Sequence, residues 1–503
     1  MTASVLCPGL QTVPEIPTAI SLPVTGTLPP YLHTSTLYRN GPGRFDLSHA
    51  DGKPQAITHW FDGYSLLHAF AIHAETNTVT YRSRFTSLPS QRAAAALPKS
   101  KYVQYTFGPA DPCRSLLGKF MQLWTTDSAD PLTDKPATNI NVTVQSVPTK
   151  GPVILRTDAN VNAVVDPDTL ELHQFFSFTD INPALKGPFS SAHGHFDHDK
   201  HEFLNFTFDM TGPGDVTYNV FSVDKVGSAD VLASIRAPPA YLHSFATTEN
   251  YLVLIVWPLH IHPLKFLWNK SFMDGMRFHK DKPARFFVVS RAQKRFVAEY
   301  NAPAFYCFHT INAFERDDAI HIDLCKYDDA EVLNDFLLDH LRNASRFSPS
   351  SVVRFSLPHL AAALAGDVAT VHPVTETLLN GSSLELPRIH PSLLRKDYRF
   401  VYGVSNRDGD TSPFGAVAKV DVVSGERKVW TKDNCVAGEP IFVPDPQGTR
   451  EDDGVLLVVV LDSLKETSAL VVLDAHQMTE VATATVPQAV PLGFHGKFHP
   501  NGH

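Results

Sequence analysis

Cysteine is scarce in this sequence, and no two cysteines stand in a C-x-x-C pair. Five cysteines are spread over 503 residues, an odd number without any paired spacing. This pattern fits neither the disulfide framework of a small secreted protein nor a zinc site built from thiolates. It favours a protein that works in a reducing compartment.

Excess positive charge and long hydrophobic runs are also absent. Asp and Glu outnumber Lys and Arg by 52 to 43, and the net charge of −9 argues against nucleic acid as a partner. The longest apolar runs, YLVLIVW and VLLVVVL, have the length of a strand and are too short to cross a bilayer. The first residues lack a basic segment and are broken by prolines, so we expect no signal peptide. These features predict a cytoplasmic protein, and none of them points to an obligate protein partner.

Short strands and turns, in contrast, are abundant. Segments such as TLYRNGPGRFDL and ARFFVVSRAQKRFVAEY alternate apolar and polar residues around turn residues. The pattern recurs along the chain with few amphipathic helices, which indicates an all-β fold. Many strand–turn–strand units without a break in composition favour a β-propeller over a sandwich, although no strict repeat gives the number of blades. We divide the chain into a Pro-rich arm, 1–30, and a single propeller domain, 31–503.

Three stretches interrupt the strand pattern. Residues 112–124 can form an amphipathic helix, residues 257–276 mix bulky apolar residues with lysines, and residues 328–342 have a helical period. The third stretch has an acidic start and a basic end, which suits the helix dipole. The first two either line a mouth that makes peripheral contact with a membrane or are insertions packed on a large domain.

Histidine is plentiful, with 24 copies, and four of them lie beside strand-like or aromatic runs. These are His193 in SAHGHFD, His243 in YLHSFATTENYLVLIVW, His309 in FYCFHTINAFE and His495 in PLGFHG. Gaps of 50, 66 and 186 residues separate them, so no two are neighbours on one helix. Only a fold that brings distant strands to a common axis would gather them. Our hypothesis is that the four imidazoles hold one non-haem iron.

Other histidines have plainer explanations. His260 and His262 form an H-x-H pair in a Pro-flanked loop, which we do not expect to bind metal. His321 lies in an alternating strand, where solvent exposure is the simplest expectation. His59 and His68, which flank the aromatic WFDG turn, are expected to be hydrogen-bonded residues of the core.

Several motifs together resemble a known family. LYRNGPGRFD and HWFDGYSLLHAF are followed, in order, by SAHGHFD, YLHSFATTENYLVL, FHTINAFE, GEPIFVP and PLGFHG. This series resembles the carotenoid cleavage oxygenases, the family that includes the retinal-pigment retinoid isomerase, from about residue 30 onward. FGPADPCRSLLGKFM and the PPAYLHS segment are most similar to the fungal torulene-cleaving branch.

The resemblance implies a seven-bladed β-propeller with helical and loop insertions that form a cap over the top face. It also implies one Fe(II) on the axis, held by His193, His243, His309 and His495 as the catalytic centre. The family's acidic residues, which hold such histidines in place, match Glu439 and Glu480, whereas the third position carries Asp158 in place of glutamate. The shorter aspartate reaches one methylene less far.

The implied reaction inserts both atoms of O2 across a conjugated C=C bond and gives two carbonyl products. The protein then supplies a dry tunnel for an apolar alkene or polyene. The candidates for its lining are Trp60, Phe61, Phe107, Phe120, Trp124, Thr157, Phe305, Phe308 and Phe494.

Three functions compete. The first is cleavage of a carotenoid or apocarotenoid, and the second is cleavage of an aryl alkene of the isoeugenol, vinylphenol or stilbene type. Stilbene-cleaving relatives hold a phenol with a Tyr and a Lys, and those places fall on Phe120 and Thr157, which argues against stilbenes. The third is a non-catalytic propeller that binds isoprenoids or proteins, for which four converging histidines would have little use.

Overall fold

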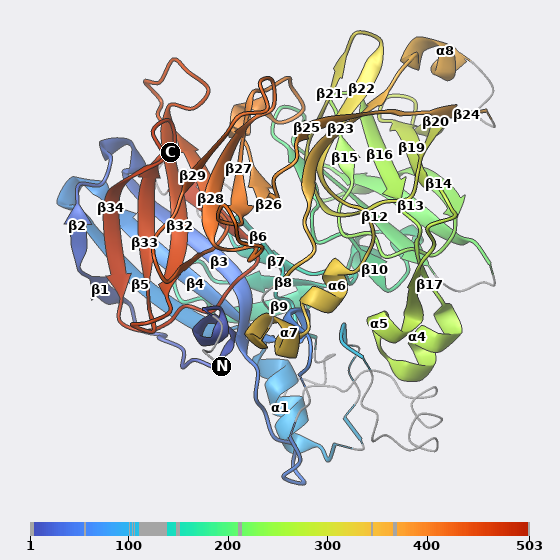
Figure 1. Cartoon of the computed structure of the whole chain (residues 1–503). Coiled ribbons are helices and arrows are strands. Elements are labelled where there is room, and N and C mark those ends of the chain that lie inside the picture. Colours follow the sequence, from blue (N-terminus) through green and yellow to red (C-terminus); the bar gives the residue numbers. More distant parts are fainter. Residues whose placement is uncertain are drawn as a thin grey trace.

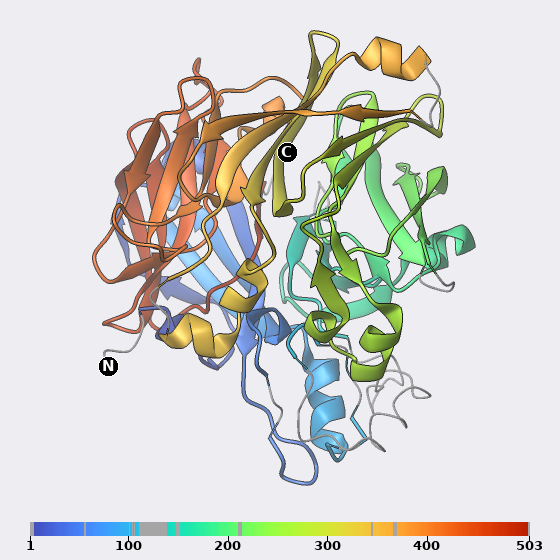
Figure 2. The same ribbon diagram turned by 45° about the vertical axis from the view of Figure 1, so that its right-hand side comes forward.

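The protein is described here by a computed structural model (Figure 1) that covers residues 5–54, 57–99, 101–102, 104, 106–109, 138–146, 151–209, 214–343, 346–365 and 370–500. Its strands form seven sheets of four to six strands and one small two-stranded sheet. Figures 1 and 2 show the large sheets arranged around a common centre, as the blades of a seven-bladed β-propeller. The predicted all-β propeller is therefore confirmed.

We number the blades I to VII along the chain. Blade I contains β1 (Ile20–Leu22), β3 (Thr34–Arg44), β4 (Tyr64–His73), β5 (Thr78–Phe85) and β35 (Gly496–Pro500). Blade II contains β6 (Thr143–Ser146), β7 (Val153–Arg156), β8 (Asn162–Val165) and β9 (Leu172–Phe176). Blade III contains β10 (Phe189–Ser190), β11 (His195–Asp197), β12 (Glu202–Asp209), β13 (Val216–Val223) and β14 (Ala229–Ala237). Blade IV contains β15 (Ala246–Thr247), β16 (Tyr251–Val256), β19 (Ala284–Ser290), β20 (Arg295–Ala302) and β24 (Val371–Pro373).

The remaining blades follow in chain order. Blade V contains β21 (Tyr306–Arg316), β22 (Ala319–Tyr327), β23 (Ser351–Leu357) and β25 (Thr375–Asn380). Blade VI contains β26 (Glu385–Arg388), β27 (Phe400–Ser405), β28 (Ala416–Asp421) and β29 (Arg427–Trp430). Blade VII contains β2 (Val24–Gly26), β30 (Cys435–Ala437), β31 (Ile441–Pro444), β32 (Gly454–Asp462), β33 (Thr467–Asp474) and β34 (Thr479–Val486). The small sheet pairs β17 (Leu259–Ile261) with β18 (Met276–Phe278).

Burial along each strand follows its place in a blade. The strand β5 alternates between buried and half-buried residues, because one of its faces is less covered than the other. The middle strand β32 is buried along nearly its whole length, and its sequence is a continuous run of Val and Leu. Blade-to-blade packing of such faces builds the hydrophobic core around the central axis.

The two ends of the chain close the ring. The C-terminal strand β35 pairs with β3 of blade I, and β2 pairs with β34 of blade VII. β1 and β2 come from the segment predicted to be an arm, so part of that segment supplies outer strands to two blades. The first and last blades are thereby tied to each other through residues from opposite ends of the sequence.

Helices are short and gather mainly on one side of the propeller. They are α1 (Leu88–Ala96), α3 (Phe178–Ile181), α4 (Pro263–Asn269), α5 (Phe272–Gly275), α6 (Val332–Asp335), α7 (Leu338–Asn343), α8 (Leu360–Ala365) and the 3-10 turns η1 (Cys7–Leu10), η2 (Pro30–Leu32), η3 (Trp60–Asp62), η4 (Ala74–Thr76), η5 (Pro183–Leu185) and η6 (Pro391–Leu393). Figure 1 shows α1, α4, α5, α6 and α7 together below the blades, where a cap was expected. No helix within the described ranges is long and apolar enough to span a membrane.

The helical predictions are corrected in detail. Residues 328–342 form two short helices, α6 and α7, and not one. The break has a local cause, because the Phe336 carbonyl accepts a hydrogen bond from the Trp60 amide and the Leu338 amide donates to the Thr58 carbonyl. Residues 257–276 contain β17, α4 and α5, and the predicted helix at 112–124 lies outside the described residues.

Candidate metal centre

Four histidines from four blades meet at the propeller axis. His193 lies between β10 and β11, His243 precedes β15, His309 lies in β21 and His495 directly precedes β35. Each of these strands is at one end of its sheet in the strand order, the end that faces the axis. One ring nitrogen of each histidine lies within 4.8 Å of those of the other three. The structure thus brings together the four residues that the sequence singled out.

Local hydrogen bonds and backbone geometry orient the histidine side chains. The His193 amide donates a hydrogen bond to the Ser191 hydroxyl, which itself donates to the His243 carbonyl, so the two loops are joined. The residue after His193 is a glycine, and only glycine fits there, because a Cβ atom at position 194 would lie 2.1 Å from the Phe203 ring. His309 lies where the register of β21 against β22 shifts, and such a bulge re-aims a side chain.

Three carboxylates from the remaining blades orient three of the histidines. Asp158 Oδ2 lies 2.7 Å from His243 Nδ1, Glu385 Oε2 lies 2.5 Å from His309 Nδ1, and Glu439 Oε1 lies 2.8 Å from His495 Nδ1. Asp158 belongs to blade II, Glu385 to blade VI and Glu439 lies between β30 and β31 of blade VII. Every blade therefore contributes one histidine or one carboxylate to the axis.

The charge of Glu439 is stabilised by two arginines. Burial alone would raise the pKa of this carboxyl group, but Arg388, His495 and Arg39 lower it far below its usual value. Burial lowers the pKa of His495 to about 3 against the opposing effect of Glu439. Burial and the three neighbouring imidazoles lower the pKa of His193 well below its ordinary value. Both imidazoles are therefore neutral at physiological pH.

The donor set fits a metal cation. The Nδ1 atoms of His309 and His495 face carboxylate oxygens, and a neutral imidazole that donates through Nδ1 carries a lone pair on Nε2. These two Nε2 atoms lie 3.2 Å apart, and those of His193 and His243 lie 3.0 Å apart. Adjacent ligands at ~2.1 Å from an octahedral metal ion are ~3.0 Å apart. A cation between the rings would attract these lone pairs, which otherwise repel one another.

The predicted carboxylates have mixed outcomes. Asp158 reaches His243 despite its shorter side chain, because the Tyr241 hydroxyl and the Ala192 amide also donate to it and fix its position. Glu439 lies where it was predicted. The prediction for Glu480 is wrong: this residue is at the exposed start of β34, where its carboxylate pairs with Lys432. Glu385 takes the role instead, and its segment SSLELPR carries no signal that distinguishes it from an ordinary surface acid.

An aromatic cavity of about 400 Å³ lies beside the histidines. His243, His309 and His495 line it together with five residues that were predicted to contact substrate, which are Phe61, Phe107, Thr157, Phe308 and Phe494. Trp60 lines it as well, whereas Phe305 is buried in the core against Phe355. Phe120 and Trp124 lie outside the described residues.

The cavity walls are rings packed edge to face. Phe61 contacts Phe107, Phe308 and Phe494 at ring-centre distances of 4.9, 5.9 and 5.4 Å. Asp62 accepts hydrogen bonds from the amides of Phe107 and Gly108 and so fixes this wall. The result is a largely apolar chamber that opens onto the imidazoles of His243, His309 and His495.

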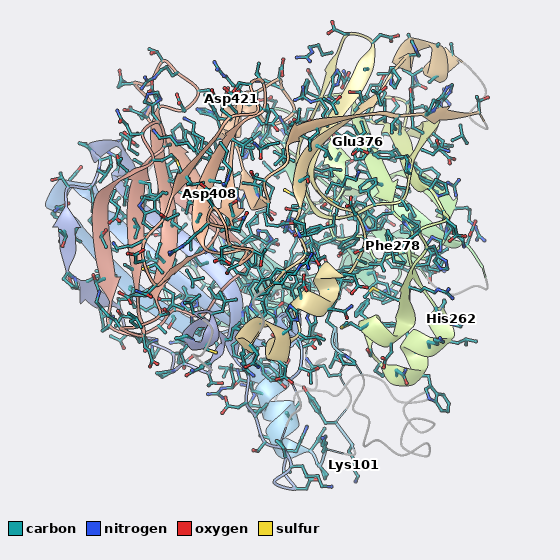
Figure 3. All side chains as sticks on the ribbon, viewed as in Figure 1. Lys101, His262, Phe278, Glu376, Asp408 and Asp421 are labelled. Atoms are coloured by element: carbon teal, nitrogen blue, oxygen red, sulfur yellow. The ribbon has the colours of Figure 1, made fainter. Side chains whose placement is uncertain are left out.

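The other histidines considered from the sequence are not part of the four-histidine group. His59 and His68 are buried and hydrogen-bonded, to the Leu333 carbonyl and the Tyr81 hydroxyl, and burial lowers the pKa of each to about 3. The expectation for these two is confirmed. His321 is half-buried and contacts Ser356, so the exposure expected for it is only partial. His262 is the N-cap residue of α4, at the edge of the molecule in Figure 3 and away from the axis.

The fold and the site define the class, a seven-bladed propeller whose axis carries a four-histidine site that fits a metal ion. Residues 10–500 match the family described as retinal pigment epithelial membrane protein. The carotenoid-cleaving dioxygenase of Macaca fascicularis is 33% identical over 98% of this chain and 94% of its own length. The torulene dioxygenase of Fusarium fujikuroi is 31% identical over 95% and 90%.

A solved structure agrees with these sequence matches in its fold. Cobalt-substituted ACO of Synechocystis superposes with a TM-score of 0.80 at 24% identity, over 99% of this chain and 98% of that one. The chain belongs to the retinal pigment epithelial membrane protein family, which includes the carotenoid-cleaving dioxygenases.

Proposed function

We propose that this protein is an Fe(II)-dependent dioxygenase that cleaves one conjugated C=C bond of a carotenoid or apocarotenoid. Each carbon of the double bond receives one oxygen atom from O2, the C=C bond breaks and two aldehydes form. The atoms and electrons balance without an external electron donor. The observation that carries the proposal is the convergence of four imidazoles beside an aromatic cavity.

The choice of iron follows from the ligands. Imidazole nitrogen suits Fe(II), and four neutral ligands leave the ion's charge undiminished and coordination positions free. Fe(II), when bound, supplies the binding and activation of O2. Asp158, Glu385 and Glu439 hold the ligand rings in place, since partners of this kind fix the tautomer and orientation of a metal-bound histidine.

The cavity residues position the substrate and exclude water. Phe61, Phe107, Phe308 and Phe494 offer ring faces and edges to a conjugated chain, which gains ~25 cal/mol for each Å² of apolar surface it buries. The names of the relatives, carotenoid-cleaving dioxygenase and torulene dioxygenase, support a polyene over an aryl alkene.

A substrate panel tests this proposal. Iron-loaded protein is incubated with torulene, β-carotene, an apocarotenal, resveratrol and isoeugenol in matched detergent, and the aldehydes are identified while O2 uptake is recorded. Protein stripped of iron with a chelator is the control. We expect aldehydes from at least one carotenoid or apocarotenoid. Inert carotenoids beside efficient cleavage of resveratrol or isoeugenol would establish the aryl-alkene function, and a lack of O2 uptake with every substrate would favour a non-catalytic binder.

Peripheral membrane contact is part of this proposal. Leu264 and Leu267 of α4 are 73% and 39% exposed, and Leu267 also lines the cavity. An apolar surface beside the cavity suits the collection of a lipid substrate. Flotation with phosphatidylcholine vesicles should be weakened by Leu264→Glu. Leu378→Glu is the matched control, because Leu378 is 62% exposed on β25, and an equal loss in both variants would refute the assignment.

A further inference from the structure

His495 lies at the point where the chain closes the propeller ring. The closing strand β35 begins at the next residue and pairs with β3, with Gly496 opposite Arg39. The Asn40 amide donates to the His495 carbonyl at 2.9 Å, and the Phe494 amide donates to the Asn40 carbonyl at 3.0 Å. The candidate ligand and the closing strand are therefore consecutive parts of one segment.

Two arginines hold this segment from either side. Arg39 donates to Glu439 Oε2 at 2.7 Å and to the Phe494 carbonyl at 3.3 Å. Arg388 donates to Glu439 Oε1 at 2.9 Å and to the Gly496 carbonyl at 3.0 Å. Glu439 in turn accepts hydrogen bonds from His495 Nδ1 and from the Gly496 amide at 2.7 Å.

Each arginine thus contacts two partners at once, the carboxylate that orients His495 and a carbonyl of a residue adjacent to it. The planar guanidinium group allows this two-point contact, whereas a lysine ammonium offers the same charge at a single point. We call Arg39, Arg388 and Glu439 the clamp. Its close packing around His495 also explains why the next residue is a glycine. A Cβ atom at Gly496 would lie 2.6 Å from Arg39 Cδ and 2.5 Å from the Tyr38 carbonyl oxygen.

We propose that Arg39 and Arg388 are positioning residues that hold His495 and the closing strand as one unit, so that metal binding and ring closure stabilise each other. The inference rests on the metal site of the proposed function. Arg39 belongs to blade I, Arg388 to blade VI and Glu439 to blade VII, so the clamp spans the seam at which the ring closes. Metal binding that fixes His495 also fixes β35 against β3. By thermodynamic linkage, pairing of β35 with β3 favours metal binding to the same extent.

The test uses the half-buried member of the pair. Arg388 is 35% exposed, whereas Arg39 and Glu439 are 4% and 1% exposed, so Arg388→Lys and Arg388→Gln are the variants expected to fold. Arg354→Gln is the matched control, because Arg354 pairs with the buried Asp323 in blade V through two 2.7 Å hydrogen bonds. The measurements are Co²⁺ affinity by competition with a chelator and amide hydrogen exchange of residues 494–499.

We expect both Arg388 variants to bind Co²⁺ at least tenfold more weakly than the wild type, with faster exchange of residues 494–499 already in the metal-free protein. Arg354→Gln should leave both readouts unchanged even if it lowers the melting temperature. If Arg388→Lys had the Co²⁺ affinity and the hydrogen exchange of the wild type, the clamp would be refuted. Lysine keeps the positive charge, so that result would mean that Arg388 only neutralises charge.

A separate measurement tests whether metal binding and ring closure are coupled. In the wild type, Co²⁺ should slow exchange of residues 494–499 more than exchange elsewhere in blade I. Equal exchange with and without Co²⁺ would show that closure and metal binding are independent. If the wild type binds no Co²⁺, the metal site is refuted, while exchange in the metal-free Arg388 variants still decides whether the clamp exists.

Discussion

Replacing Glu385 by Gln is a direct test of the carboxylate that the structure adds to the site. The Glu385 carboxylate lies 2.5 Å from His309 Nδ1, and both side chains are 10% exposed. Gln keeps an oxygen that can accept the hydrogen bond but removes the negative charge that strengthens it. Loss of such a partner typically weakens metal binding ~10–100-fold, which corresponds to ~1.4–2.7 kcal/mol. Since Gln retains an acceptor, we expect the lower half of this range.

Glu480→Gln is the matched control for that experiment. Glu480 and its partner Lys432 are 35% and 45% exposed, and an ion pair of this kind contributes ~0–1 kcal/mol to stability. Metal affinity is measured for both variants by competition with a chelator of known affinity, and far-UV circular dichroism confirms the fold. Wild-type affinity in Glu385→Gln, or an equal loss in Glu480→Gln, would refute the assignment of Glu385.

Three further predictions follow from the same geometry. His243→Ala and His495→Ala should abolish metal content and turnover while leaving the β-sheet circular dichroism intact, and retained metal would contradict the four-histidine site. Tyr241→Phe should weaken metal binding by about tenfold or more in the same competition assay, because the hydroxyl that holds Asp158 is lost and hydrogen bonds to charged groups are worth ~1.5–3 kcal/mol. The free energy of unfolding should fall as pH drops below ~6.5, since buried His68, with a pKa of about 3, takes up a proton only on unfolding. His68→Gln should reduce that slope by about one proton, and an unchanged slope would contradict the prediction.

The propeller and the four candidate ligands could be predicted from the sequence for physical reasons. Alternating strands and turn residues are local signals, and they recur in every blade. His309 and His495 stand in aromatic or glycine-containing motifs whose spacing rules out a single helix. Their convergence follows once the strands that carry them end at a common axis.

The partners of the ligands were harder to predict, because they depend on how separate blades meet. Glu385 begins β26 and faces His309 across the boundary between blades V and VI, a contact that spans 76 residues. Glu480 stands in an equally strand-like segment, but near the start of β34, where the side chains are exposed. The break between α6 and α7 has the same origin, since it depends on hydrogen bonds to residues 58 and 60.

Thr157 provides the sharpest test of substrate class. It lines the cavity next to Asp158, which holds His243. A phenol that enters this chamber leaves water, and an unpaired hydroxyl costs ~1–3 kcal/mol, whereas the centre of a polyene has no such cost. Threonine cannot supply the charged partner that a phenol oxygen would need, so turnover per active site should be higher with a carotenoid or apocarotenoid than with resveratrol.

Two substitutions at this position separate charge from shape. Thr157→Val keeps the β-branched shape and removes only the hydroxyl, so carotenoid turnover should stay within about twofold of wild type, since no polar contact to the polyene is lost. Thr157→Lys should lower it at least tenfold, because an ammonium group is costly to bury beside a polyene and would compete with His243 for Asp158. Both are assayed in matched detergent at equal metal content, which removes differences in solubility and loading. A carotenoid reaction improved by Thr157→Lys, or a wild type that prefers resveratrol, would refute the polyene assignment.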